Sequence, residues 1–259
     1  MTLIHGLIFK KNNFNEWIFQ KELIPREDIS QDSEGFDMGC GSGRWAQFVI
    51  SKVGRLNCID PSSAIYVAES NLKKYDNAFF YKETVDACSL KNESQDFGYS
   101  LGVLHHIPDT QKAINDCAIK LKKGAPFLLY LYYNFEDKPA LFKLIWKLTD
   151  LLRLKVISKL PPRIKKTTCS IIAIIIYYPL AKFSRMLEIL GINVENMPLS
   201  DYRNKSFYIM RNDALDRFGT KLEQRFSKKD ITNMLKNSGF HKITFSNRTP
   251  YWTCISYKA

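Results

Sequence analysis

Three glycines occupy every second position of the loop Gly39–Gly43, within the stretch FDMGCGSGRW that runs from Phe36 to Trp45. Glycine inside a regular element costs about 0.5–1 kcal/mol relative to alanine, so this spacing is tolerated where the backbone turns sharply or lets a ligand come close. The loop follows a predicted short strand and precedes a predicted helix that opens at Arg44. In an open parallel sheet, such a turn lies at the carboxyl edge of the strands, where ligands bind.

Short apolar segments bounded by turn residues alternate with longer mixed segments over the next hundred residues. Strands are predicted at 56–60, 77–83, 96–103 and 126–134, and helices at 62–75 and 110–124. This alternation predicts an α/β fold with a parallel sheet. It stops after Asn134 and returns as a helix at 227–240, which an antiparallel pair of strands follows.

Two further segments precede and interrupt this pattern. Residues 1–33 are predicted to form an N-terminal helical lid, and residues 135–226 a mostly helical insertion before the C-terminal segment 227–259. The insertion contains the apolar run CSIIAIIIYYPLA (169–181), with Pro179 inside it. Because a helix needs about 20 apolar residues to cross a bilayer, we expect this run to form a buried or an interfacial helix.

The net charge of +12 is concentrated in the insertion. Eleven Lys and Arg residues lie between Lys138 and Arg185, against the single acid Asp150, which gives this segment a charge of +10. Such a segment favours an anionic neighbour, namely a phospholipid surface, a phosphorylated substrate or nucleic acid. A solvated cationic face without a partner is the alternative.

The six cysteines are scattered, without CxxC pairs or histidines at metal-binding spacing: Cys40, Cys58, Cys88, Cys117, Cys169 and Cys254. The N-terminal residues do not read as a secretory signal peptide. We therefore expect reduced thiols, no metal site and a cytoplasmic location.

Two carboxylates follow the next two predicted strands. Asp60 comes 17 residues after Gly43, at a strand end where a carboxylate can accept hydrogen bonds from both hydroxyls of a ribose. Asp86, in the motif VDA after the third strand, can accept a hydrogen bond from an exocyclic amine. A nicotinamide dinucleotide is the alternative ligand. It is disfavoured because GCGSG has one residue between its second and third glycines, where the GxGxxG fingerprint has two.

With these motifs in order, the chain resembles the class I S-adenosylmethionine-dependent methyltransferases, in particular the methyltransferase type 11 family and its small-molecule, ubiquinone-biosynthesis-like branch. The motifs DMGCGSG, CIDPSS, VDA, DFGYSLGVLHHIPD and LKKGAPFLLYLYY fall within a core at 34–134, which 227–259 completes. The resemblance implies a seven-stranded Rossmann-like sheet and S-adenosyl-L-methionine as the cofactor. It places the cofactor-binding residues at Asp37, Gly39, Cys40, Gly41, Gly43, Asp60, Pro61, Asp86, Ala87, Leu101 and Gly102.

By the same resemblance, the stretch from Leu101 to His106 lines the methionine end of the cofactor. An imidazole with a pKa near 6.5 can act as a base at neutral pH, which makes His105 the candidate catalytic residue. In the family, one histidine of LHHI usually packs and the other lies near the rim of the site, so a packing role for His105 is the alternative. A free-amine acceptor needs no dedicated base.

The acceptor is expected to contact the insertion, which is the part that differs from the common core. Arginine suits phosphate and carboxylate because its guanidinium binds them bidentately. The candidate acceptor-binding residues are Tyr202, Arg203, Tyr208, Arg217 and Arg225. An ordinary polar surface with internal ion pairs is the alternative.

Three functions stay open at this point. The first is methyl transfer to a small-molecule, saccharide or lipid-linked acceptor, with residues 138–190 either in peripheral contact with the inner face of the membrane or forming a homodimer. The second is a nucleic-acid methyltransferase that uses the basic insertion, which the lack of an RNA-binding module and of an NPPY-like motif disfavours. The third is a cofactor-binding protein without catalysis, whose insertion is an oligomer interface.

Overall fold

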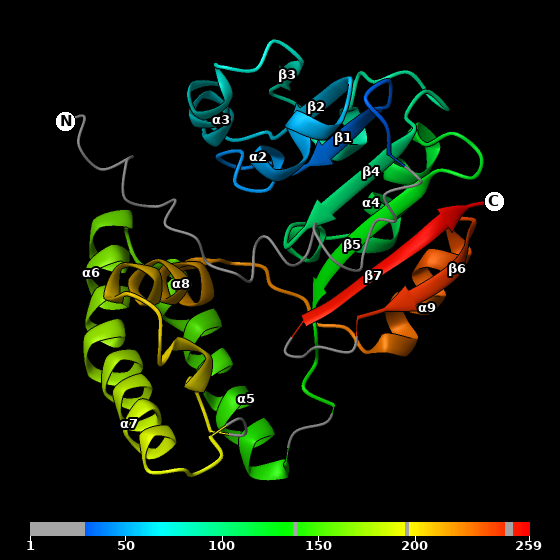
Figure 1. Ribbon diagram of the computed structural model, residues 1–259. Helices are drawn as coiled ribbons and strands as arrows, with labels where there is room; N and C mark the ends of the chain where they lie inside the picture. Colours follow the sequence, from blue (N-terminus) through cyan, green and yellow to red (C-terminus); the bar gives the residue numbers. More distant parts are fainter. Residues whose placement is uncertain (1–28, 137–138, 195–196, 247–250) are drawn as a thin grey trace. The chain divides into compact units, whose positions relative to one another are not determined.

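The computed structural model describes residues 29–136, 139–194, 197–246 and 251–259 (Figure 1). The chain divides into two compact units. The first, which we call the sheet unit, combines Met1–Glu136 with Gln224–Ala259, and the second, the helical unit, is Asp137–Glu223. The lid predicted at 1–33 lies outside the described residues except for its last five, which are irregular, so it stays a prediction.

The sheet unit is built on seven strands in the order β3-β2-β1-β4-β5-β7-β6. The strands are β1 (Glu34–Met38), β2 (Arg55–Ile59), β3 (Ala78–Tyr81), β4 (Phe97–Leu101), β5 (Pro126–Tyr132), β6 (Phe240–Phe245) and β7 (Tyr251–Lys258). The first five strands pair in parallel, and β7 pairs antiparallel with both β5 and β6. The predicted seven-stranded, Rossmann-like sheet with its antiparallel C-terminal pair is confirmed.

Helices cover both faces of this sheet, as Figure 1 shows. They are α2 (Ala46–Val49) and α3 (Ala64–Leu72) over one core, and α4 (Thr110–Lys120) and α9 (Lys228–Asn237) over the other. Because the central strands are buried on both faces, their side chains alternate between the two cores. Phe36 and Met38 of β1 join the core of α4 and α9, whereas Phe97 and Tyr99 of β4 join the core of α2 and α3.

The boundaries of two helices show how local sequence sets them. A capping box is present at the start of α9, where Ser227 Oγ accepts from the Asp230 N–H at 3.0 Å and Asp230 Oδ2 accepts from the Ser227 N–H at 2.9 Å. The helix predicted to open at Arg44 instead begins at Ala46 and has four residues. It is short because the chain must return into β2, and the Gly54 N–H already donates to the Ser33 carbonyl at 3.0 Å.

The helical unit contains α5 (Ala140–Lys155), α6 (Pro162–Ile172), α7 (Tyr178–Ile189) and α8 (Phe207–Gly219). A π-helical turn, η6 (Ala173–Tyr177), joins α6 to α7, so Pro162–Ile189 is one continuous helical stretch. One side of this stretch packs against Met210, Ala214 and Phe218 of α8 through Cys169, Ala173, Tyr177 and Ala181. The core of the unit is therefore mainly a seam between two helices.

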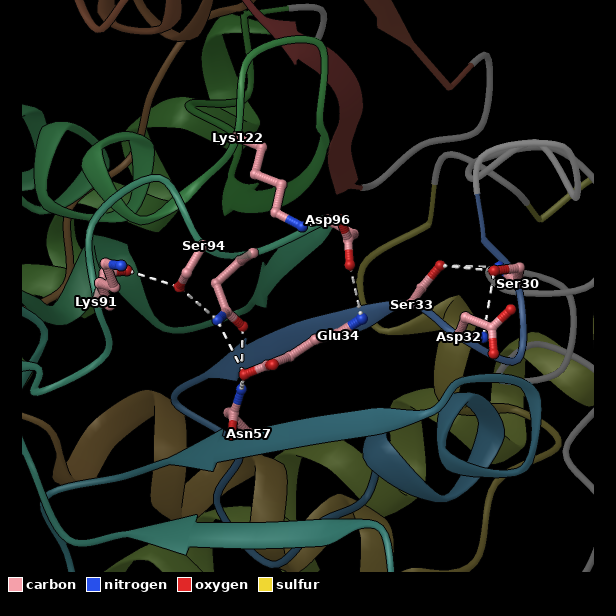
Figure 2. Close-up of polar contacts among 10 residues, drawn as sticks. Ser30, Asp32, Ser33, Glu34, Asn57, Lys91, Ser94, Asp96 and Lys122 are labelled. Atoms are coloured by element: carbon pink, nitrogen blue, oxygen red, sulfur yellow. Dashed lines mark hydrogen bonds and ion pairs between the residues drawn. The ribbon is translucent and has the colours of Figure 1, made fainter.

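A polar network with Asn57 and Gln95 at its buried centre ties together the starts of β1 and β4 (Figure 2). Asn57, which is fully buried in β2, donates from Nδ2 to Glu34 Oε1 at 2.9 Å and to Gln95 Oε1 at 3.0 Å. The Glu34 N–H donates to Asp96 Oδ2 at 2.9 Å, and Lys122 Nζ donates to Asp96 Oδ1 at 2.6 Å. The network lies at the amino ends of the strands, away from the glycine loop that follows β1.

Replacement of Asn57 by alanine is expected to lower the free energy of unfolding by roughly 2–4 kcal/mol, because Glu34 and the buried Gln95 each lose a donor. Denaturant titration measures this loss. The control is Asn92→Ala, since Asn92 is exposed and accepts a hydrogen bond from Lys120 at the surface. Equal stability losses for the two variants would contradict a structural role for the network.

Candidate active site

The glycine loop is held against the end of β2 by backbone hydrogen bonds. The Gly39 and Cys40 N–H groups donate to the Ile59 carbonyl at 2.8 and 3.0 Å, and the Gly41 N–H donates to Asp60 Oδ2 at 2.9 Å. Gly39 and Gly41 have φ angles of 83° and 53°, in the left-handed region that favours glycine. The loop therefore runs across the carboxyl edge of the sheet with its shape fixed by the next strand.

Two glycines of the loop have different surroundings. A Cβ on Gly39 would overlap the side chain of Val103, so that position must be glycine for the loop to pack. A Cβ on Gly41 would meet no atom within 4 Å and would point into open space. The backbone at Gly41 is therefore accessible to a ligand that approaches the end of β1.

Asp60 and Asp86 present carboxylates along the same edge. Asp60 is half-buried, and its Oδ1 accepts from the N–H and the hydroxyl of Ser62 at 2.9 and 2.6 Å. Asp86 is exposed in a 3-10 turn, Val85–Ala87, after β3. Hydrogen bonds from the Thr84 side chain and from its own backbone N–H lower the pKa of Asp86, so its carboxylate is ionised at neutral pH.

Asp37 has a different environment, because it is buried within β1 and 1% exposed. The pKa of the Asp37 carboxyl is raised to about 8, mainly by burial and also by the nearby Asp60 carboxylate. A hydrogen bond with Tyr99 opposes this rise in part. At pH 7 the Asp37 side chain is therefore mostly a neutral carboxylic acid. A positive charge placed beside it would favour the carboxylate and displace its proton.

The end of β4 contributes the methionine-end candidates. Leu101 is buried at the last position of β4, and Gly102 follows with a φ of 79°. The Gly102 N–H donates to the Tyr130 carbonyl at 3.0 Å, and the Tyr130 ring lies 3.5 Å from where a Cβ on Gly102 would be. The ends of β4 and β5 are thus adjacent, with an aromatic ring between them.

The remaining predicted cofactor residues lie along the same edge. Gly43 completes the loop with a φ of 77°, while Pro61 and Ala87 are exposed next to the two acids. Cys40 is buried, and a hydrogen bond with Cys58 together with burial raises the pKa of its thiol. Cys40 is therefore a protonated packing residue. Every cofactor-binding residue predicted from the sequence lies in or after one of the strands β1 to β4.

Residues 36–129 match a family model described as a methyltransferase domain. This segment contains the glycine loop, Asp60, Asp86 and the ends of β4 and β5. This segment of the chain is a methyltransferase domain, and the strand order of the sheet is that of the class I S-adenosylmethionine-dependent methyltransferase fold. A search of curated proteins by sequence found no match.

Solved structures with the same fold include other methyltransferases. A SAM-dependent methyltransferase from Methanosarcina mazei is 18% identical with a TM-score of 0.52, and the match covers 92% of this chain and 98% of that one. The 1,6-didemethyltoxoflavin-N1-methyltransferase from Burkholderia thailandensis, with bound 1,6-didemethyltoxoflavin and S-adenosylhomocysteine, is 12% identical with a TM-score of 0.52 over 88% of this chain and 72% of that one. At these identities the likeness shows the fold.

Some matches cover less than two thirds of the matched protein. The chain spans 54% of the length of a protein from Galdieria sulphuraria, which is 22% identical over 53% of this chain with a TM-score of 0.44. It spans 66% of a protein from Bordetella parapertussis, which is 11% identical over 95% of this chain with a TM-score of 0.52.

His105, the predicted catalytic residue of this methyltransferase, is fully buried. Its ring stacks on Tyr132 with the centroids 3.8 Å apart, and neither of its nitrogens has a hydrogen-bond partner among the described residues. The pKa of His105 is lowered to about 2, mainly by burial and to a smaller extent by the neighbouring His106 and Arg225. The imidazole is therefore neutral and enclosed, an arrangement that suits the packing alternative; its role as a base stays a prediction.

The pH dependence of stability is expected to reveal this burial. A neutral buried histidine contributes stability that is present above its unfolded pKa of about 6.5 and is lost as the pH falls below that value. Replacement of His105 by phenylalanine keeps the ring stack and removes the titrating group. We expect the melting temperature of His105→Phe to rise relative to wild type as the pH is lowered from 7 to 5. The same substitution at the exposed His241 is the control, and parallel pH curves for wild type and His105→Phe would contradict the prediction.

The predicted acceptor-binding residues are distributed over both units. In the helical unit, Arg203 pairs with Glu188 at 2.9 Å and Arg217 pairs with Glu223 at 2.8 Å. Tyr202 packs edge-on against Tyr177 with the ring centroids 5.2 Å apart. The two ion pairs fit the alternative hypothesis for these residues, a polar surface with internal ion pairs. Tyr208 is 40% exposed in α8, where the Arg211 guanidinium lies 5.6 Å from its ring centroid.

Arg225 belongs to the sheet unit, and it lies beside two aromatic residues that the sequence analysis did not name as candidates, Tyr132 and Phe135. Its guanidinium carbon lies 5.1 Å from the ring centroid of Tyr132 and 4.5 Å from that of Phe135. With His105 and Tyr130, these side chains form an aromatic and cationic cluster at the carboxyl end of β5. The alternation of aromatic residues at the end of PFLLYLYYN was the available signal.

Proposed function

We propose that this methyltransferase binds S-adenosyl-L-methionine at the glycine loop and transfers its methyl group to a small-molecule or lipid-linked acceptor. The observation that carries the proposal is the open backbone at Gly41, held by its N–H beside the carboxylate of Asp60 at the carboxyl edge of the sheet. The Burkholderia thailandensis enzyme of the same fold has S-adenosylhomocysteine bound, which supports the same ligand class here.

The residues at this edge fit the parts of the cofactor. Each oxygen of a carboxylate accepts about two hydrogen bonds, so Asp60 Oδ2 keeps capacity for a ribose hydroxyl while it accepts from the Gly41 N–H. Asp86 is exposed and ionised, as an acceptor for the adenine amine requires. The buried Asp37 can balance the positive charge of the methionine ammonium, with Leu101 and Gly102 beside that end.

When bound, S-adenosyl-L-methionine supplies a methyl group on a sulfonium, which the acceptor attacks in line. The chain's own residues then act mainly by positioning and by electrostatics. The cluster of Tyr130, Tyr132 and Arg225 at the end of β5 is the surface of the sheet unit that we assign to the acceptor. Its aromatic faces can stabilise a nearby cationic centre, and the guanidinium can orient an anionic acceptor.

Calorimetry followed by a transfer assay tests this proposal. The purified chain, shown to be folded by circular dichroism, is titrated with S-adenosylhomocysteine and then incubated with methyl-labelled S-adenosyl-L-methionine and a library of soluble and lipid-linked saccharides. Binding with transfer to one acceptor class is the expected result. A folded protein that releases no heat with either cofactor form would overturn the proposal. Binding without transfer to any acceptor would favour a non-catalytic cofactor-binding protein.

A further inference from the structure

The helical stretch Pro162–Ile189 exposes large apolar side chains along much of its length. Ile175 is 66% exposed and Ile189 is 75% exposed. The other exposed apolar residues of this stretch are Ile164, Ile171, Ile174, Ile176, Tyr178, Leu180, Phe183 and Met186. Soluble monomers rarely expose contiguous apolar patches larger than a few hundred Å², so a face of this kind marks an interaction surface.

The packing of the helical unit explains why this face is left uncovered. The side of the stretch that is buried against α8 carries Cys169, Ala173, Tyr177 and Ala181 at four-residue spacing. Ile171, Ile174 and Ile175 lie between these positions and are exposed, so they point away from the seam, whereas Ile172 packs against it. We call this exposed side the isoleucine face.

We propose that the isoleucine face binds the surface of an anionic lipid bilayer, with the helix lying in the plane of the interface. The charges around it favour that occupant. Arg163 and Lys166 are exposed before the apolar run, Lys182 and Arg185 follow it, and residues 151 to 187 contain no Asp or Glu. A helix with an apolar face flanked by Lys and Arg has the composition of an interfacial anchor. The proposal does not depend on the proposed methyl transfer.

A bilayer-spanning orientation fits the structure less well. Among the described residues, this stretch is the helix that is long and apolar enough to cross a membrane by length and composition. However, its charge-free run from Thr167 to Ala181 has 15 residues, or about 22 Å of helix, which is shorter than the ~30 Å hydrocarbon core. Insertion across the bilayer would also carry α8, with Asp213 and Arg217, into hydrocarbon.

A second copy of the chain is a poorer occupant than an anionic lipid surface. A symmetric dimer through this face would bring together two segments that each carry +10 between Lys138 and Arg185. Like charges placed opposite each other across an interface oppose association, whereas anionic headgroups attract the same lysines and arginines. Charge complementarity therefore selects the bilayer.

A second helix of the same unit has the same character. The apolar residues of α5 that are 50–60% exposed are Leu144, Ile145, Leu148, Leu151 and Leu152. Their spacing of three, four and seven residues places them on one side of the helix. Lys143 directly precedes them in the sequence, and Lys147 lies between Ile145 and Leu148. The helical unit thus offers two apolar, lysine-bordered helix faces.

Flotation of the full chain with vesicles tests the proposal. Vesicles of phosphatidylcholine alone are compared with vesicles that contain 30% phosphatidylglycerol. We expect wild type to float with the anionic vesicles, and Ile175→Glu to reduce the bound fraction about tenfold. Ile119→Glu is the matched control, because Ile119 is a 46% exposed isoleucine on α4 of the sheet unit, and it should bind as wild type does.

A charge variant keeps the test informative if Ile175→Glu destabilises the fold. Replacement of both Lys182 and Arg185 by glutamine leaves the isoleucine face intact, and we expect it to lower the preference for anionic over neutral vesicles several-fold. Failure of wild type to float with anionic vesicles would overturn the proposal, as would equal binding by all variants. A wild-type dimer in light scattering that Ile175→Glu dissociates, without vesicle binding, would assign the face to a second copy instead.

Discussion

Replacement of Gly41 by alanine is expected to weaken the binding of S-adenosylhomocysteine about 100-fold while the protein stays folded. The reason is that a Cβ at this position enters the open space beside the Asp60 carboxylate, where we place the cofactor. The substitution also strains a backbone with a φ of 53°, which costs roughly 1–2 kcal/mol for a residue with a side chain. That cost lowers stability without unfolding a domain of this size. Calorimetric titration and thermal melting measure the two effects separately.

The matched control is Gly124→Ala. Gly124 has a φ of 81°, and a Cβ there also meets no atom within 4 Å, but the residue lies in the turn between α4 and β5, away from the glycine loop. Both substitutions should lower the melting temperature by similar amounts. If they also weakened the ligand equally, the loss at Gly41 would reflect general strain and the assignment of the loop would be wrong.

The sheet unit was predictable because each of its local patterns agrees with the fold. Strands such as 126–134 are continuously apolar, as parallel strands buried on both faces must be. The helix predicted at 110–124 is present but ends earlier, at Lys120, and Gly124 lies in the turn that follows it. The helix predicted to open at Arg44 begins at Ala46 and is short, and this difference has a physical cause. Helix propensity does not reveal that only the eleven residues 44–54 separate the glycine loop from β2, which limits α2 to one turn.

The helical unit was less predictable because hydrophobicity does not say which face of a helix is covered. The run at 169–181 is apolar all round, and only the packing of α8 decides that Cys169 and Ala173 are buried while Ile174 and Ile175 are exposed. Periodicity alone left a buried and an interfacial helix equally open.

In the candidate site, too, some features could be predicted from the sequence and others depend on tertiary packing. The positions of Asp60 and Asp86 at the carboxyl edge of the sheet could be predicted from their spacing after strands, because their backbone positions follow from the topology. The environment of His105 could not, since its burial against Tyr132 depends on contacts between β5 and the turn after β4. The pairing of Arg203 with Glu188 likewise joins residues 15 apart, which the sequence pattern does not reveal.

Replacement of Asp37 by asparagine is expected to raise stability at alkaline pH and to weaken cofactor binding. A buried acid whose pKa is raised to about 8 contributes stability that is present below its unfolded pKa and is lost as the pH rises through about 8. Asparagine has the same shape and does not titrate. From pH 5 to pH 8 the variant should therefore gain roughly 3 kcal/mol over wild type, or about 6–10 °C in melting temperature.

The same substitution is expected to lower the affinity for the cofactor, although it raises stability, and to change how that affinity depends on pH. In wild type, a cationic group bound beside Asp37 must displace a proton at pH 7, so the affinity for S-adenosylhomocysteine should rise between pH 6 and pH 8 and then level off. In Asp37→Asn the affinity should be lower, by about tenfold at pH 8, and independent of pH over this range. Proton uptake or release measured by calorimetry in buffers of different ionisation enthalpy checks this directly. A wild-type protein that binds without releasing a proton at pH 7 would show that Asp37 does not contact the positive end of the cofactor.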